Sequence, residues 1–262
     1  MGAESIAHVL RAEIDAWSSS PGPWPRTLAR VLKALGYVRR FLRNPRIRSE
    51  QLTRLLNRDA HYQGATATEH DRYPELFRAC QRHLQNTPSP SILSFGCSTG
   101  EEVFSLAEYL PHAKIVGVDI NRWCLQQCAK KNRNPRVRFL HSLSPEYAAL
   151  GGFDAIFCMA IFQRTENRTR PTEVAHGNFN FEKFEEEIRA LDKRLKAGGL
   201  LFIDHADFRF EDTDVAARFT PLEFDGNLFT HDRPVFDRDN RLIATQYSVH
   251  RAFRKQSASA ER

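Results

Sequence analysis

The sequence is poor in the features that mark membrane and secreted proteins. No run of apolar residues approaches the length of about 20 that a membrane-spanning helix needs. The first residues lack the basic and apolar segments of a signal peptide, and Ile6 stands where a myristoylation signal requires serine or threonine. These absences lead us to expect a cytoplasmic protein.

Cysteine is also scarce, which argues against the small disulfide-rich and zinc-finger classes. The five cysteines cannot all pair within one chain, and none has the spacing of metal ligands. Cys124 and Cys128 lie one turn apart in a predicted helix, where buried small apolar side chains are a better interpretation than a redox pair. The cysteines therefore indicate neither a disulfide framework nor a metal site.

Acidic residues are scarce in one region. The chain carries 38 Lys and Arg against 32 Asp and Glu, and between residues 26 and 58 ten basic residues face Glu50 alone. Apolar residues recur among them at helical spacing, from Leu28 to Leu42, which predicts an amphipathic basic helix. Its basic side can be a solvated face, the rim of an anionic-substrate site or a membrane-surface contact. Interleaved aromatic residues that would stack on bases are missing, so we expect no nucleic-acid partner.

The most informative segment runs from Ser91 to Asn121 and contains a strand, a glycine turn, a helix, a second strand and an acid. Gly96 ends the first strand, where the chain must turn sharply beside a ligand. Gly100 allows the next helix to start close to that ligand. Asp119 ends the second strand, where a carboxylate can accept hydrogen bonds from a ribose. This order predicts a nucleotide-type pocket in an α/β sheet.

A third glycine is missing from this turn, and its absence disfavours a nicotinamide oxidoreductase. A pyrophosphate needs bare backbone at a helix N-terminus, but Cys97 and its neighbours carry side chains into the turn. Glu101 and Glu102 would repel a phosphate while complementing the helix dipole. They are either simple surface charges or partners of a positively charged ligand without phosphate, such as S-adenosylmethionine.

The segment Gly96–Glu102, followed by Ser105–Ala107, resembles the first motif of the CheR-type chemotaxis receptor methyltransferases. These belong to the class I S-adenosylmethionine-dependent methyltransferases. The resemblance extends upstream to Thr68 and Arg72, which match a Thr-x-x-x-Arg pair that touches the cofactor in that family. Downstream it includes Phe153–Cys158, like the family's fourth strand, and Leu195–Ile203, like its glycine turn and fifth strand. It spans roughly residues 66 to 205.

Two departures from the CheR type concern the substrate. The helix predicted near 121–131 is followed almost at once by Pro135, which leaves no room for the β subdomain that docks on receptors. Met159 and Ala160 stand where the family carries an Arg-Asn pair. The resemblance therefore implies the cofactor and not a protein-glutamate substrate.

Strands and helices alternate along the chain and predict a Rossmann-like α/β fold with a mostly parallel twisted sheet. At 262 residues, the chain can hold one such domain with a helical extension. We expect a helical N-terminal cap over 1–88, a cofactor-binding domain over 89–256 and a tail over 257–262. The alternating segment 240–250, paired with a strand within 219–237, would form a C-terminal antiparallel hairpin. The parallel strands are predicted at 91–95, 114–119, 137–141, 153–158 and 200–204.

The cofactor site can be assigned by place in this fold. The resemblance implies that Arg72 binds the cofactor carboxylate and that Glu102, rather than Glu101, reaches its polar part. Asp119 would hold the ribose hydroxyls, and Ile120 would pack on adenine. The full set of expected cofactor residues is Thr68, Arg72, Phe95, Gly96, Cys97, Ser98, Gly100, Glu102, Asp119, Ile120, Ser142, Leu143, Met159 and Ala160.

Acceptor residues should lie beyond the carboxyl ends of the strands. His205 is the candidate general base, because an imidazole suits proton abstraction near neutrality, and Asp207 accompanies it. A metal on these two residues is a poorer interpretation, since no third ligand is evident. Candidate substrate-binding residues are Tyr62, Phe162 and Arg164, and His61 is a further possibility.

We thus expect an S-adenosylmethionine-dependent methyltransferase. It would transfer a methyl group by SN2 displacement to an O or N atom of a small-molecule acceptor, which can be lipid-linked or acidic. Most of the rate can come from aligning the nucleophile behind the methyl group. Two alternatives stay open: a CheR-like protein carboxyl methyltransferase, and a non-catalytic regulatory protein that binds the cofactor.

Overall fold

The computed structural model describes residues 18, 22–57, 62, 66, 68–169, 172–175 and 179–257. The chain divides into two compact units, Met1–Leu52 and Thr53–Arg262. His61, the helix expected within residues 1–17 and most of the expected tail lie outside the described residues.

The basic segment forms two helices, the first of which contains the predicted amphipathic stretch. α2 (Pro23–Arg43) begins with proline in its first turn and ends with Arg40 and Arg43, which complement the helix dipole. Asn44 breaks the helix before α3 (Pro45–Leu56), because a residue that precedes proline is driven out of the helical region. Among the described residues, no helix is long and apolar enough to cross a membrane.

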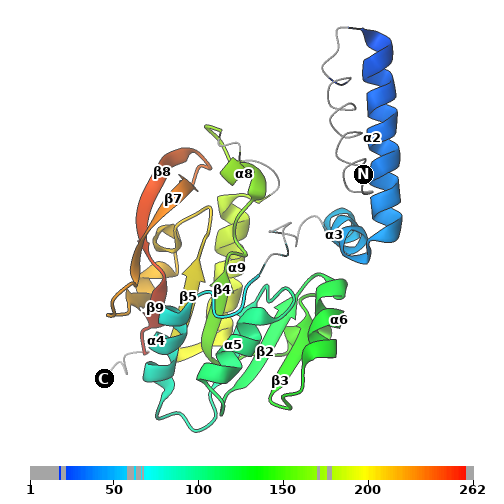
Figure 1. Cartoon of the computed structure of the whole chain (residues 1–262). Coiled ribbons are helices and arrows are strands. Elements are labelled where there is room, and N and C mark those ends of the chain that lie inside the picture. Colours follow the sequence, from blue (N-terminus) through cyan, green and yellow to red (C-terminus); the bar gives the residue numbers. More distant parts are fainter. Residues whose placement is uncertain are drawn as a thin grey trace. The chain divides into compact units, whose positions relative to one another are not determined.

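The second unit is built around a seven-stranded sheet, whose strand order is β3-β2-β1-β4-β5-β9-β6 (Figure 1). Strands β3, β2, β1, β4 and β5 are parallel, and β9 is antiparallel to both β5 and β6. This mostly parallel sheet confirms the Rossmann-like prediction. The strands are β1 (Ser91–Phe95), β2 (Lys114–Asp119), β3 (Val137–His141), β4 (Phe153–Met159), β5 (Leu195–Asp204), β6 (Phe219–Pro221) and β9 (Ala252–Lys255).

Helices cover both faces of the sheet because its central strands alternate two sets of buried side chains. On one face, α4 (Pro74–Leu84) and α5 (Glu101–Tyr109) pack against residues such as Ile92 and Phe157. On the other, α7 (Pro145–Ala148) and α9 (Phe181–Arg194) pack against residues such as Leu93. The remaining helical segments are α6 (Arg122–Lys131), α8 (Thr165–Thr169) and the 3-10 turns η1 (Phe210–Asp212) and η2 (Ala216–Arg218).

The predicted C-terminal antiparallel hairpin is confirmed as β7 (Leu228–Phe236) and β8 (Leu242–His250). It forms a two-stranded sheet of its own, whereas we had expected it to end the main sheet. The edge beside β5 is instead occupied by β9, whose pairing with β5 and β6 completes the main sheet. Pro234 has no amide hydrogen to donate, and the register of the hairpin shifts between Asp232 and Val235.

All five cysteines are buried, and none of them forms a disulfide. Cys124 and Cys128 point inward from α6, as predicted for small apolar side chains. The Cys128 thiol donates to the carbonyl oxygen of Ser98 at 3.2 Å. The cysteines of α6 therefore support the turn that follows β1.

Candidate active site

The glycine turn after β1 is built from left-handed backbone and anchored on β2. Gly96, Ser98 and Gly100 have φ of 81°, 49° and 92°. The amides of Gly96 and Cys97 both donate to the carbonyl oxygen of Val118, at 2.8 and 2.9 Å. Gly100 also packs closely against Phe104, since a Cβ atom on residue 100 would lie 3.0 Å from the Phe104 ring. These hydrogen bonds fix the turn at the carboxyl ends of the neighbouring strands β1 and β2.

Asp119 joins this turn to α6. One carboxylate oxygen accepts the Ser98 amide at 2.8 Å, and the other accepts the Asn121 amide at 2.7 Å. Burial raises the pKa of Asp119, and these backbone hydrogen bonds oppose that rise. Each oxygen keeps further acceptor capacity, which is what a ribose diol would use.

Glu101 and Glu102 face different surroundings. Glu101 accepts hydrogen bonds from Thr99 and from the Lys131 ammonium, both at 2.6 Å, so its charge is paired. Glu102 accepts a hydrogen bond from Ser94 of β1 at 2.7 Å, and burial raises its pKa to about 7. The Ser94 hydrogen bond and the Arg72 charge act against that rise. Glu102, the residue expected to reach the cofactor, is thus the inward one.

Arg72 and Tyr73 precede α4 at the entrance to this turn. The exposed guanidinium of Arg72 stacks 5.2 Å from the centroid of the Tyr73 ring. Tyr73 is 6% exposed, and its hydroxyl has no hydrogen-bond partner among the described residues. A buried hydroxyl left without a partner costs free energy, which a polar ligand at this point would offset. Thr68, which is half-buried, precedes Arg72 in the same segment.

The expected adenine side lies at the ends of β2 and β3. The Ser142 amide donates to the Asp119 carbonyl oxygen at 3.0 Å, which holds the two strand ends together. Ile120 and Ser142 are half-buried, and Leu143 is 55% exposed. A flat apolar base can pack here between side chains that are not fully covered.

Strands β4 and β5 end side by side. Met159 pairs with Asp204, and the Ala160 amide donates to the Asp204 carbonyl oxygen at 2.9 Å. Ala160 and His205, the residues that follow, both have left-handed φ, 59° and 56°. For side chains larger than glycine this conformation is strained, and such strain gathers at functional sites.

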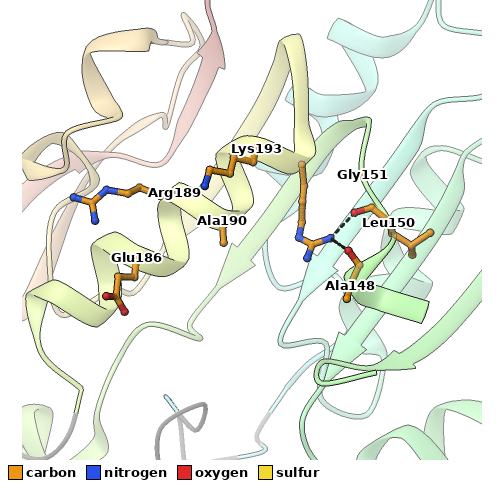
Figure 2. A pocket seen from close by; sticks show the side chains of 8 residues that line it. Ala148, Leu150, Gly151, Glu186, Arg189, Ala190 and Lys193 are labelled. Atoms are coloured by element: carbon orange, nitrogen blue, oxygen red, sulfur yellow. Dashed lines mark hydrogen bonds between the residues drawn. The ribbon is translucent and has the colours of Figure 1, made fainter. Parts of the chain in front are cut away.

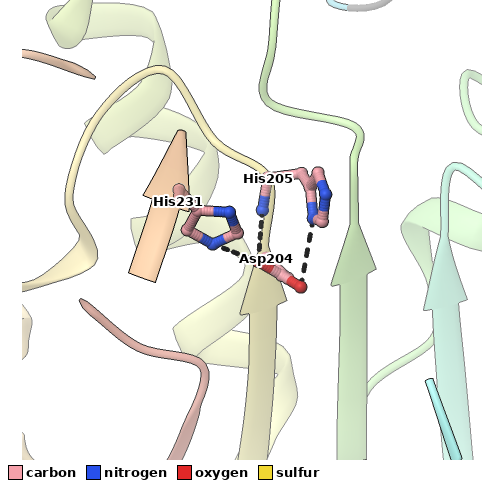
Figure 3. Close-up of side chains that lie close together, drawn as sticks. All are labelled: Asp204, His205 and His231. Atoms are coloured by element: carbon pink, nitrogen blue, oxygen red, sulfur yellow. Dashed lines mark hydrogen bonds and ion pairs between the residues drawn. The ribbon is translucent and has the colours of Figure 1, made fainter. Parts of the chain in front are cut away.

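His205 belongs to a buried polar cluster with Asp204 and His231 of β7 (Figure 3). Its Nδ1 lies 3.1 Å from one Asp204 oxygen, and His231 Nε2 lies 2.7 Å from the other. Burial lowers the pKa of His205, and the neighbouring Asp204 carboxylate opposes that effect. Arg251 lies 3.3 Å from Asp204 and 2.9 Å from Glu75 of α4.

Asp207 fastens the loop that follows β4. Its carboxylate accepts the Arg164 amide at 2.8 Å and the Asn167 side-chain amide at 2.6 Å. Its own amide donates to the Phe162 carbonyl oxygen at 2.7 Å. Burial raises the pKa of Asp207 to about 6, although the Asn167 and Arg164 hydrogen bonds act against it. These contacts give Asp207 a positioning role, and a catalytic role for it stays a prediction.

Tyr62 and Phe162, two expected substrate residues, lie in an aromatic cluster. Phe162 is fully buried, with ring centroids 5.8 Å from Tyr62 and 5.2 Å from Phe184. The Tyr62 hydroxyl donates to Glu187 at 2.7 Å. Phe162 is thus buried within this cluster, and a role for Tyr62 and Phe162 in substrate binding stays a prediction.

A groove of about 510 Å³ lies between α7 and α9 (Figure 2). It adjoins Gly151, just before β4, so it is at the edge of the sheet opposite the Gly96 turn. The Arg194 guanidinium beside it donates to the carbonyl oxygens of Tyr147, Ala148 and Leu150. That cation satisfies the end of α7, and the groove is separate from the candidate site.

Sequence reasoning missed several polar side chains that lie close to the expected site residues. Asp204 precedes the expected His205, and Tyr73 follows the expected Arg72. His231 and Arg233 are two residues apart in one strand, so a shared face was a signal that could have been used. Arg233 Nη1 donates to the Gln163 side-chain oxygen at 2.6 Å, which links the hairpin to the loop after β4.

Comparison with known families bears on the core of this site. Residues 92–176 match the family model for a methyltransferase domain. Over this stretch the chain is similar to that family. The matched stretch includes most of β1, the glycine turn and Asp119. No curated protein matches the sequence.

Solved structures with similar folds are also methyltransferases. PKMT2 from Rickettsia typhi in complex with AdoHcy is 21% identical, with a TM-score of 0.33, over 44% of this chain and 20% of that one. Precorrin-6y C5,15-methyltransferase from Geobacter metallireducens is 15% identical, with a TM-score of 0.43, over 73% and 94%. N-methyltransferase NodS from Bradyrhizobium japonicum is 16% identical, with a TM-score of 0.43, over 71% and 99%. The chain thus spans about a fifth of the Rickettsia protein.

Proposed function

We propose that this protein is an S-adenosylmethionine-dependent methyltransferase that acts on an O or N atom of a small-molecule acceptor. The observation that carries the proposal is the arrangement of Gly96, Glu102 and Asp119 at the ends of β1 and β2. It combines a tight left-handed turn with two inward carboxylates, one on the turn's helix and one on the next strand. A cationic ligand without phosphate fits this arrangement better than a dinucleotide does.

The residues present fit such a cofactor. Asp119 would accept the ribose hydroxyls, and Ile120 with Leu143 would cover the adenine. Glu102 and the unpartnered Tyr73 hydroxyl would serve the polar methionine end. Arg72, whose charge already acts on Glu102, would pair with the cofactor carboxylate.

The cofactor supplies a methyl group on a sulfonium, which is already a good electrophile. The chain's own task is to hold an acceptor atom in line behind that methyl group and to keep water out. The ends of β4 and β5 are joined by the Ala160–Asp204 backbone hydrogen bond, which brings the methionine side within one strand of His205. We place the acceptor on that side, with His205 and Asp207 as the expected catalytic pair and Arg164 at its edge.

The basic segment 26–58 bears on the class of acceptor. An acidic or lipid-linked acceptor would give the basic segment 26–58 a purpose, since α2 combines basic residues with exposed Leu35 and Leu42. Sedimentation with vesicles of anionic phospholipid at low salt tests this variant. Full recovery of the protein in the supernatant would remove it. A CheR-like protein carboxyl methyltransferase and a non-catalytic cofactor-binding protein are the alternatives.

Calorimetric titration of S-adenosylhomocysteine into the purified full chain tests the cofactor and the pocket together. We expect micromolar binding by the wild type and at least about tenfold weaker binding by Asp119→Ala, because one lost charge-assisted hydrogen bond costs about 1.5 kcal/mol or more. Lys114→Ala, at the opposite end of β2, is the matched control and should bind like the wild type. No binding by the wild type, with binding of NADH instead, would replace the proposal by an oxidoreductase. Binding without turnover on any acceptor would favour the regulatory alternative.

A further inference from the structure

Three potential metal ligands meet where β5 ends. Asp204 is the last residue of β5, His205 follows it, and His231 comes from the separate β7 strand (Figure 3). One ligand atom from each residue lies within 4.8 Å of the ligand atoms of the other two. Sequence reasoning rejected a metal at His205 because no third ligand was evident, and the hairpin supplies it.

The two imidazoles are held in an unusual relation to the carboxylate. His205 Nδ1 and His231 Nε2 are 3.1 and 2.7 Å from Asp204 oxygens. Both nitrogens are buried, yet neither forms a well-directed hydrogen bond with any described residue. Buried polar atoms that converge without hydrogen-bond geometry call for a further partner. A cation between them would accept a lone pair from each.

From this geometry we propose that Asp204, His205 and His231 bind a divalent first-row transition-metal ion. Two imidazoles and one carboxylate are the donor set of zinc, iron and manganese sites with open positions for other ligands. Mg²⁺ and Ca²⁺ prefer oxygen ligands and are poorly matched to two imidazoles. The proposed species is therefore Zn²⁺, Fe²⁺ or Mn²⁺, with at least one position left for a solvent or acceptor oxygen.

The surroundings of Asp204 are those of a supported ligand. Its Oδ1 accepts the His205 amide at 2.7 Å, and its Oδ2 lies 3.3 Å from Arg251. Contacts of this kind orient a ligating carboxylate. The Arg251 charge is shared with Glu75 at 2.9 Å, which reduces its repulsion of a metal ion.

Space for a solvent ligand lies beside the cluster. A small cavity of about 20 Å³ is lined by Asp204, His205 and Tyr247 among others. That volume is enough for about one water molecule. The Tyr247 hydroxyl is engaged with the Ala206 carbonyl oxygen at 3.1 Å and so forms a fixed wall.

The metal site deepens the proposed methyl transfer and rests on it for its role. Because Asp204 pairs with Met159, an ion here would lie one strand from the cofactor's methionine side. An acceptor hydroxyl bound to the ion would lose its proton to bulk water more readily. Its oxygen lone pair would then form the new C–O bond as the S–C bond breaks, leaving the S–C electron pair on a neutral thioether. His205 would act as a ligand through Nδ1 in place of the general base expected from the sequence.

Metal binding by the full chain tests the site without any activity assay. The protein is stripped with a chelator and titrated with Zn²⁺ by calorimetry, and with Co²⁺ while visible absorption is followed. We expect one ion per chain and a d–d spectrum typical of nitrogen and oxygen ligands. His231→Gln and Asp204→Asn should each weaken Zn²⁺ binding by about tenfold or more. His112→Gln, which removes an exposed imidazole in the turn before β2, should leave it unchanged.

Two outcomes would overturn the metal site: no Zn²⁺ binding by the wild type, or equal binding by wild type and His231→Gln. S-adenosylhomocysteine titration of the same samples separates this failure from failure of the proposed function. A variant that keeps cofactor binding while losing Zn²⁺ is folded and has lost only the metal site. A wild type that binds Zn²⁺ but no cofactor would leave the metal site standing and remove the methyltransferase proposal.

Discussion

Gly96 and Ile161 approach each other so closely that no side chain fits between them. A Cβ atom on Gly96 would lie 2.6 Å from Cδ1 and 2.9 Å from Cγ1 of Ile161. Gly96 also has a φ of 81°, which side chains other than glycine rarely adopt. The end of β1 and the loop after β4 can therefore pack this closely only because residue 96 has no Cβ atom.

We expect Gly96→Ala to lower the free energy of unfolding by about 1–3 kcal/mol, since it adds overpacking to backbone strain. It should also weaken S-adenosylhomocysteine binding, because the turn must move. Urea unfolding and calorimetry measure the two effects. Gly36→Ala is the matched control: nothing lies within 4 Å of its would-be Cβ, and it sits inside α2. That change should be neutral or stabilise by up to about 1 kcal/mol. Equal effects of the two substitutions would contradict the fit.

Glu102 should make stability depend on pH between 4.5 and about 7. Burial raises its pKa in the folded state from 4.5 to about 7, so the folded protein binds a proton that the unfolded chain releases. Its contribution is complete below pH 4.5 and is lost as pH rises through about 7. The loss should be on the order of 1 kcal/mol or more.

The measurement is the melting temperature of the cofactor-free protein from pH 5 to 8, beside that of Glu102→Gln. The neutral amide cannot ionise, so the wild type should lose stability relative to this variant as pH rises. Glu101→Gln serves as the control. The pKa of Glu101 is lowered despite its partial burial, because Lys131 and Thr99 donate hydrogen bonds to it. A constant difference between wild type and Glu102→Gln would mean that Glu102 is not buried as described.

Phe162 should contribute mainly to the free energy of unfolding and not to substrate binding. Its ring is fully buried against Phe184 and Phe95, at centroid distances of 5.2 and 6.1 Å. Phe162→Ala should cost about 3–5 kcal/mol through lost burial and a cavity. Leu143→Ala, at a residue 55% exposed, should cost less than about 0.5 kcal/mol. A Phe162→Ala variant as stable as wild type would restore Phe162 to the acceptor pocket.

The sequence was sufficient for the parts of the fold that depend on local pattern. The strands β1, β2 and β3 begin and end where predicted, because short apolar runs are bounded there by turns and helices. The left-handed turn at Gly96 and the positions of Glu102 and Asp119 beside it were predictable, because these residues lie within one strand–helix–strand unit whose geometry follows from spacing. That they bind the cofactor stays a prediction.

The polar contacts around Asp204 were harder to predict from the sequence, since their residues come from distant parts of the chain. His231 reaches Asp204 only because β7 and β8 form a separate sheet, which no local pattern distinguishes from an extension of the main sheet. The same is true of Arg251, which contacts both Asp204 and Glu75 and lies 176 residues from Glu75 in the sequence. Burial of Phe162 was equally non-local, because its ring contacts come from β1, α9 and Tyr62.

Because all five cysteines are buried, the folded protein should react only slowly with thiol reagents. Maleimide reagents should react with it only as fast as it opens, so labelling reports global or local unfolding directly. A single cysteine introduced at an exposed position such as Leu143 would then carry a fluorophore just beyond the end of β3 with no competing labels. Titration of S-adenosylhomocysteine could be followed from that one position in real time.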